Sequence, residues 1–166
     1  MRGRTSSYHG QDMGNYISKR YEDTVEYGRT IGSSLMGGEM IILTGQLGSG
    51  KTVLTKGIAE GLQIDEVITS PSFTIMNLYT GRLELCHFDF YRIEDRSEML
   101  DLIEDYLYRR QSVSVVEWGE PLTGVLEIFI HVHIDISGER RVISMERRNG
   151  AGEVPEERGG NRDTHR

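Results

Sequence analysis

A glycine-rich segment at residues 45–52 constrains the fold of this chain more than any other feature, and it reads GQLGSGKT. It matches the pattern G-x-x-x-x-G-K-[ST] in full, and this pattern forms a phosphate-binding loop between a strand and a helix. Residues 40–44 are a short apolar run of strand length, and apolar side chains recur with helical spacing over residues 51–62. The motif therefore lies in the context that it requires, and it predicts a P-loop.

Each position of this loop has a physical role. Glycines allow successive backbone N–H groups to turn toward an anion, and the following helix directs its partial positive charge to the same place. The pattern predicts that Lys51 reaches the outer phosphates of ATP and that the Thr52 hydroxyl is a ligand of Mg²⁺. The residues expected to contact the nucleotide are Gly45, Leu47, Gly48, Ser49, Gly50, Lys51 and Thr52.

Two acidic residues follow apolar runs that are predicted to be strands. A P-loop enzyme needs a carboxylate near the metal ion and often another group that orients the attacking water. Asp89 lies near the end of residues 83–90, and Glu117 directly follows residues 112–116. The strand before Glu117 is the more apolar and so the more central, which favours Glu117 as the magnesium-side carboxylate and Asp89 as the water-positioning group. The predicted catalytic residues are Lys51, Asp89 and Glu117.

The rest of the pattern predicts an α/β protein: a single P-loop NTPase-like domain with a mixed central sheet flanked by helices. Residues 1–17 and 148–166 are rich in Gly, Arg, Ser and Glu, which predicts flexible tails around a domain at residues 18–147. The other expected elements are helices over residues 21–36 and 98–108, the second capped by Ser97, and strands over residues 73–79, 83–90, 112–116, 127–136 and 141–146.

Charge and composition limit the kinds of partner. Residues 1–20 carry four basic side chains against one acidic, a net charge of +3, and residues 147–166 carry five against four, a net charge of +1. Because the whole chain has a net charge of -7, residues 21–146 between these ends have a net charge of -11. A domain this acidic repels the negatively charged phosphate backbone of a nucleic acid, so tRNA contact is expected only through a partner protein. No apolar run is long enough to span a membrane, and the N-terminal residues contain no apolar segment of a signal peptide. Cys86 is the one cysteine and cannot form an internal disulfide, so we expect a cytoplasmic protein in which Cys86 is buried.

Several other residues have two interpretations. Residues 70–74 could place hydroxyl groups near the outer phosphate or could form a simple turn. Arg92 could contact a phosphate or pair with nearby acids, and Trp118 could cover the site or belong to the core. His131 and His133 alternate along a strand and are interpreted as surface or edge-strand residues, since no metal-ligand spacing accompanies them.

Four segments together resemble the TsaE family, small bacterial P-loop ATPases of tRNA threonylcarbamoyladenosine biosynthesis. They are residues 45–52, then SPSFT at 70–74, HFDFYR at 87–92 and VEW at 116–118. Their order and spacing also match, and the resemblance covers about residues 18 to 146. The three later segments are far more specific than the P-loop itself.

The resemblance implies a protein that binds ATP and Mg²⁺ and hydrolyses ATP slowly when alone. It implies two partners, TsaB and TsaD, which together transfer the threonylcarbamoyl group to adenosine 37 of tRNA. ATP hydrolysis by the TsaE-like protein would reset their complex between turnovers. By the same resemblance, Thr74, Arg92 and Trp118 line or support the site. The chain departs from the family pattern at Gln46, Val53 and Leu102, and none of these positions carries an expected phosphate or metal ligand.

Two other function classes use a P-loop. A small-molecule kinase would need a lid with arginines, and residues 62–82 contain no arginine cluster. A nucleotide-dependent binding module with negligible turnover would use the same residues as a slow ATPase. For the adenine base, residues 21–24 and the hairpin near Arg140 are the candidates.

Overall fold

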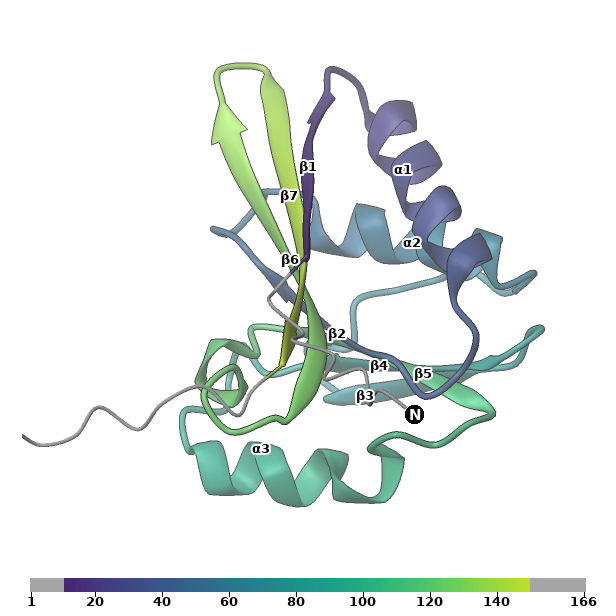
Figure 1. Ribbon diagram of the computed structural model, residues 1–166, viewed down its shortest axis with the longest axis vertical. Coiled ribbons are helices and arrows are strands. Elements are labelled where there is room, and N and C mark those ends of the chain that lie inside the picture. The colour runs from purple at the N-terminus through teal and green to yellow at the C-terminus, as the bar shows by residue number, and fades with distance from the viewer. Residues whose placement is uncertain (1–10, 150–166) are drawn as a thin grey trace, which may run out of the picture.

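A seven-stranded mixed sheet forms the centre of the computed structural model, which describes residues 11–149 (Figure 1). The strand order is β1-β7-β6-β2-β5-β4-β3. Strand β2 runs parallel to β5 and β6, β4 runs parallel to β5, and the other pairs are antiparallel. The strands are β1 Gln11–Ser18, β2 Met40–Thr44, β3 Met76–Tyr79, β4 Glu84–Asp89, β5 Ser112–Glu117, β6 Ile128–Ser137 and β7 Arg140–Asn149.

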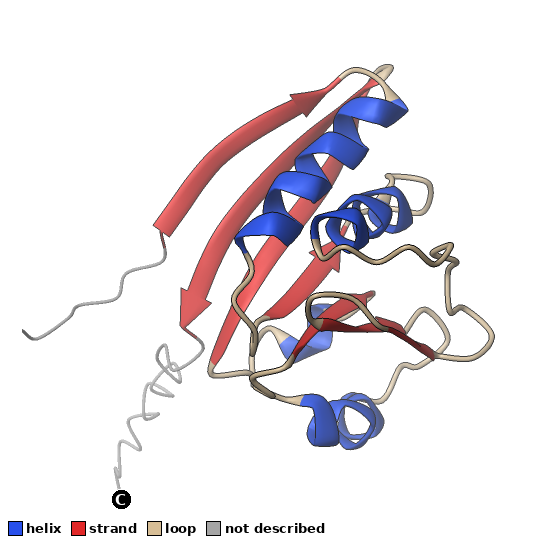
Figure 2. Cartoon of the chain, turned by 90° about the vertical axis from the view of Figure 1, so that its right-hand side faces the viewer, coloured by secondary structure: helices blue, strands red, loops and turns tan. Residues whose placement is uncertain are grey.

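Helices cover both faces of the sheet, which confirms the predicted α/β class (Figure 2). The helices are α1 Tyr21–Ser34, α2 Lys51–Gly61 and α3 Arg96–Ile103, with 3₁₀ turns at Glu104–Tyr106 and Glu120–Leu122. Side chains alternate along β2: Ile41 and Leu43 pack in the cluster with α1 and α2, whereas Met40 and Ile42 pack in the cluster with α3. All five residues of β2 are buried, as expected for a central parallel strand.

Helices α1 and α2 touch through their backbones at glycines. A Cβ atom added at Gly57 of α2 would lie 2.1 Å from the Val25 carbonyl oxygen, and one added at Gly32 of α1 would lie 2.2 Å from that of Ile58. Only residues without a side chain permit this approach. The contact fixes the position of α2, the helix that begins directly after the glycine-rich loop.

The structure corrects the expected N-terminal tail. Residues 11–17 form most of β1, which pairs with β7, so the prediction of a tail is wrong there. Their composition misled because β1 is an edge strand whose Met13 and Ile17 are exposed. Backbone pairing with β7 holds the strand, together with Tyr16, which packs against the core and stacks on Tyr27. The predicted C-terminal tail is also wrong at residues 148–149, which are the end of β7. The remaining predicted tail residues, 1–10 and 150–166, lie outside the described residues.

Several other boundaries differ from the prediction, and two of them have a clear local cause. Strand β3 begins at Met76 rather than at residue 73, because the Ile75 N–H group donates to the Pro71 carbonyl at 2.7 Å and closes a turn. Helix α3 is capped by Asp95 rather than Ser97, because the Asp95 carboxylate accepts hydrogen bonds from two N–H groups of the first turn.

His131 and His133 were predicted to be surface or edge-strand residues. The edge-strand alternative is wrong, because β6 lies between β7 and β2, whereas both side chains are partly exposed, at 17% and 40%. Both imidazoles are partly buried and hydrogen-bond the Thr44 hydroxyl, at 2.8 and 2.7 Å. Cys86 is completely buried, as predicted, and its burial raises the pKa of the thiol to about 11.

Candidate functional site

The glycine-rich loop connects the end of β2 to the start of α2, as the motif predicts. Gly48 and Gly50 have φ angles of 79° and 106°, in the left-handed region that favours glycine. A Cβ atom at Gly45 would lie 2.6 Å from the Ile134 carbonyl oxygen on β6. The loop conformation therefore depends on glycine at these three positions.

Lys51, the first residue of α2, is buried beneath the loop, with a relative exposure of 5%. Its Nζ donates to the carbonyl oxygens of Gly45 at 2.6 Å and Gln46 at 3.1 Å, and it lies 4.1 Å from the centre of a Trp118 ring. An ammonium group has three donors, so one remains after these two bonds. Burial lowers the pKa of Lys51, and the charges of nearby acids, Glu117 foremost, oppose that shift.

Thr52 and Glu117 meet across the cleft between α2 and β5. The Thr52 hydroxyl donates to Glu117 Oε1 at 3.0 Å, and Glu117 is only 3% exposed. Strand β5 pairs with β2 on one side and β4 on the other, so the prediction that its strand is central is confirmed. His87 Nε2 on β4 lies 3.1 Å from the same Oε1, a contact that the sequence motif did not reveal.

Asp89 lies beside Glu117 in the parallel register of β4 and β5. Its carboxylate accepts the Ser70 hydroxyl at 3.1 Å and the backbone N–H of Tyr91 at 2.9 Å. The two predicted carboxylates thus end neighbouring strands at one edge of the sheet, where ligands of such sheets bind.

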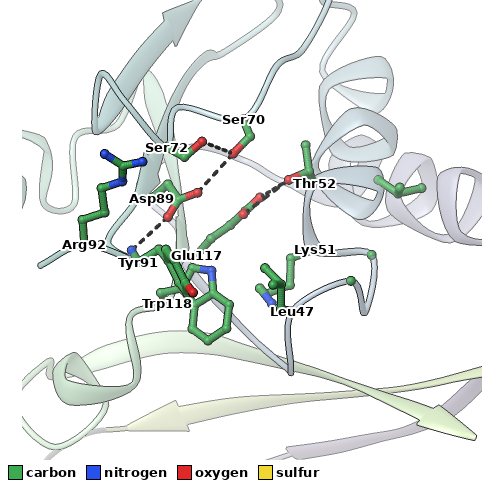
Figure 3. A pocket seen from close by; sticks show the side chains of 13 residues that line it. Leu47, Lys51, Thr52, Ser70, Ser72, Asp89, Tyr91, Arg92, Glu117 and Trp118 are labelled. Atoms are coloured by element: carbon green, nitrogen blue, oxygen red, sulfur yellow. Dashed lines mark hydrogen bonds between the residues drawn. The ribbon is translucent and has the colours of Figure 1, made fainter. Parts of the chain in front are cut away.

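A cavity of about 470 Å³ lies where these groups converge (Figure 3). Its volume is within the range of about 300–1,000 Å³ that small-molecule pockets have. It brings together nine of the predicted site residues: Leu47, Gly48, Gly50, Lys51, Thr52, Asp89, Arg92, Glu117 and Trp118. The sequence did not predict Tyr91, and it left the role of Ser70 and Ser72 open.

Three predicted residues lie outside this lining. Gly45 contributes through its carbonyl group to Lys51, and Ser49 faces a second cavity. The Thr74 hydroxyl instead donates to the Asn77 side chain at 3.1 Å, in the turn before β3. Arg92 lines the cavity with its guanidinium over the Phe73 ring, 4.4 Å from the ring centre.

The second cavity, of about 240 Å³, adjoins the first and shares Gly48, Gly50 and Val53 with it. Its remaining lining includes Tyr21 and Thr24 of α1 and Arg141 of β7, the regions that the sequence analysis considered for an adenine base. The Arg141 guanidinium donates to the Ser49 carbonyl at 3.2 Å and so ties the hairpin to the loop.

This strand–loop–helix arrangement, with its lysine, hydroxyl and carboxylates, places the chain in the class of P-loop nucleotide-binding folds. The sequence model of the family "Threonylcarbamoyl adenosine biosynthesis protein TsaE" matches residues 18–148. The chain therefore belongs to the TsaE family, as the sequence motifs indicated.

Individual relatives agree with this membership. The protein named tRNA threonylcarbamoyladenosine biosynthesis protein TsaE in Treponema pallidum is 36% identical over 129 residues, which cover 76% of this chain and 96% of that protein. The protein of the same name in Bacillus subtilis is 49% identical over 83 residues, covering 49% and 51% of the two chains. The crystal structure of Bacillus subtilis YdiB is similar with a TM-score of 0.70 and 26% identity, over 84% of this chain and 88% of that one.

No helix within residues 11–149 is long and apolar enough to cross a membrane.

Proposed function

We propose that this protein is a magnesium-dependent ATPase with slow intrinsic turnover that supports threonylcarbamoyl transfer to adenosine 37 of tRNA through a TsaB–TsaD complex. The observation that carries the ATPase part is the convergence of Lys51, Thr52, Asp89 and Glu117 on one cavity at the end of parallel strands. Membership of the TsaE family supports the role in tRNA modification.

The loop fits a nucleotide phosphate group. Its glycines leave room for close approach of an anion, and the N-terminus of α2 adds partial positive charge. On binding, the Lys51 ammonium would exchange two neutral carbonyl acceptors for charged phosphate oxygens, a stronger kind of hydrogen bond.

Thr52 and Glu117 supply the oxygen atoms that Mg²⁺ prefers. No group of three or more His, Cys, Asp and Glu side chains in residues 11–149 is arranged to hold a metal ion. Mg²⁺ does not require one, because it keeps several waters and binds through one or two carboxylates together with substrate phosphates. When bound there, Mg²⁺ would neutralise charge on the β- and γ-phosphates.

Asp89 is suited to orient the attacking water. Its two oxygens are held by Ser70 and the Tyr91 backbone, and it stays at the cavity wall beside Glu117. By accepting a hydrogen bond from the water, it would direct the water oxygen at the γ-phosphorus. As that bond forms, the bond from the γ-phosphorus to the β–γ bridging oxygen of ATP breaks, ADP leaves with this oxygen, and the water proton ends on the released phosphate. Trp118 would hold Lys51 in place and limit access of bulk water.

The second cavity is our choice for the adenine and ribose. The two cavities have Gly48, Gly50 and Val53 in common, so one nucleotide could extend from one cavity into the other. Tyr21 offers an aromatic ring for the base, and Thr24 and Arg141 offer polar groups.

The rim of the first cavity offers a surface for the partner proteins. Leu47 and Tyr91 line the cavity and are 73% and 54% exposed, and Phe73, which is 83% exposed, lies against Arg92 of the lining. Exposed apolar side chains at the edge of a cavity are candidates for an interaction surface. A TsaB–TsaD complex bound there would contact the nucleotide site directly, which would explain slow turnover without it.

Phosphate release from ATP and Mg²⁺ tests the proposal, measured with and without TsaB and TsaD. We expect slow release by the wild type, faster release with the partners, and none from Lys51→Ala. Lys56→Ala is the matched control, because Lys56 lies on the same helix but outside the cavity lining. Turnover that ignores the partners would keep the P-loop ATPase and remove the tRNA role; nucleotide binding without turnover would indicate a binding module.

A further inference from the structure

His87 is a fully buried imidazole beside the proposed magnesium site, and neither the nucleotide nor the metal is expected to touch it. It lies on β4, two residues before Asp89, with a relative exposure of 0%. Its Nε2 is 3.1 Å from Glu117 Oε1 on the neighbouring strand. Its Nδ1 has no hydrogen-bond partner within the described part of the chain.

The hydrogen-bond inventory identifies the tautomer. An ionised carboxylate only accepts hydrogen bonds, so the proton of the imidazole must be on Nε2. A proton on Nδ1 would instead be a buried donor without an acceptor, and an unmade hydrogen bond of this kind is unfavourable. The geometry therefore places a proton on Nε2, and within residues 11–149 this donor points at Glu117.

Glu117 depends on this donor for its orientation. Its Oε1 accepts from both the Thr52 hydroxyl, at 3.0 Å, and His87, while Oε2 is 3.4 Å from the same hydroxyl. The Thr52 bond comes from α2 and the His87 bond from β4, so the carboxylate is fixed from two separate elements. Without His87, the Thr52 hydroxyl, itself the expected metal ligand, would be the one remaining hydrogen-bond donor to this carboxylate within residues 11–149.

We propose that His87 is a positioning residue for Glu117: its Nε2–H fixes Oε1 and so leaves Oε2 directed to Mg²⁺ or to a magnesium-bound water. This inference rests on the proposed function, in which Glu117 is the magnesium-side carboxylate. Partners that orient the ligands of a metal ion change metal affinity or activity by about 10–100-fold when removed.

A pair of matched variants isolates the Nε2 donor. In His87→Gln the side-chain amide nitrogen reaches the place of Nε2, whereas in His87→Asn it reaches only the place of Nδ1. Both variants lose the ring and bury an amide, so their difference reports the donor rather than packing. The first measurement is binding of Mn²⁺, a substitute for Mg²⁺, in the presence of ADP by electron paramagnetic resonance; the second is the Mg²⁺ concentration that gives half-maximal phosphate release.

We expect His87→Asn to weaken Mn²⁺ binding and raise the half-maximal Mg²⁺ concentration by about 10–100-fold, with His87→Gln within about threefold of wild type. Equal behaviour of the two variants would overturn the proposal. Wild-type protein that binds Mn²⁺ with ADP but releases no phosphate would remove the ATPase function and leave this test intact. Wild type that binds no Mn²⁺ with ADP overturns both.

One measurement needs no variant and so does not depend on folding of a mutant. Long-range ¹H–¹⁵N spectra of histidine-labelled wild-type protein distinguish the Nε2–H form of an imidazole from the Nδ1–H form. We expect the Nε2–H form for His87. A proton on Nδ1 alone would show that Nε2 cannot donate to Glu117 and would end the argument.

Discussion

Replacement of Gly57 by alanine tests whether the glycine contact between α1 and α2 holds the P-loop helix in place. A Cβ atom at this position would lie 2.1 Å from the Val25 carbonyl oxygen and 2.9 Å from Gly28 Cα. Both are backbone atoms, so no side chain can rotate away, and the two helices must separate by about an ångström to regain ordinary contact distances.

The magnitude follows from two opposing effects. Overpacking typically costs about 1–3 kcal/mol, and the backbone clash places Gly57→Ala at the upper end of that range. Alanine in a helix gains about 1 kcal/mol over glycine. The net loss in the free energy of unfolding is therefore about 2 kcal/mol, which in a domain of this size lowers Tm by about 4–8 °C.

Thermal unfolding followed by circular dichroism measures this loss. Gly124→Ala is the control, because a Cβ atom there meets nothing within 4 Å and its φ is not in the left-handed region; we expect its Tm within about 2 °C of wild type. If Gly57→Ala is as stable as Gly124→Ala, the helices tolerate the added methyl group and the glycine contact does not set their separation.

Two more predictions concern single side chains. Glu117→Gln removes the negative charge that Mg²⁺ would meet but keeps a hydrogen-bond acceptor for Thr52. In titration calorimetry, nucleotide binding by this variant should therefore lose most of its dependence on Mg²⁺. An unchanged dependence would exclude Glu117 from the ligands of the metal ion. The pKa of Cys86 in the folded state is about 11, above the ordinary value of 9.0. The protonated thiol therefore adds to the free energy of unfolding below pH 9, and this contribution is lost as the pH rises from 9 to 11. Urea unfolding should therefore show a steeper loss of stability over this interval in wild type than in Cys86→Ala, and parallel curves would contradict the assignment.

The sequence predicted the parts of the fold that are governed by local patterns. The strand Met40–Thr44 and the helix from Lys51 have the observed start points, because an apolar run and a glycine-rich loop determine them locally. Strand β1 was missed because its partner is β7, at the other end of the chain. The pairing supplies what its residues lack in apolar pattern, and no local pattern reveals such a pairing.

The candidate site divides in the same way. The motif gave Lys51 and Thr52, and the ends of two strands gave Asp89 and Glu117, all of which line one cavity. His87 lies within a matched motif, yet its contact with Glu117 depends on the parallel register of β4 with β5. A register between strands that are far apart in sequence cannot be inferred from either strand alone.

Trp118 is the single tryptophan of the chain, and a ring of its indole lies 4.1 Å from the Lys51 ammonium. Indole emission responds to charges close to the ring. All of the tryptophan fluorescence of this protein therefore arises at the loop, without background from elsewhere in the fold. Any anion that draws Lys51 away from the ring would change the emission, so the unlabelled protein carries its own optical reporter of occupancy.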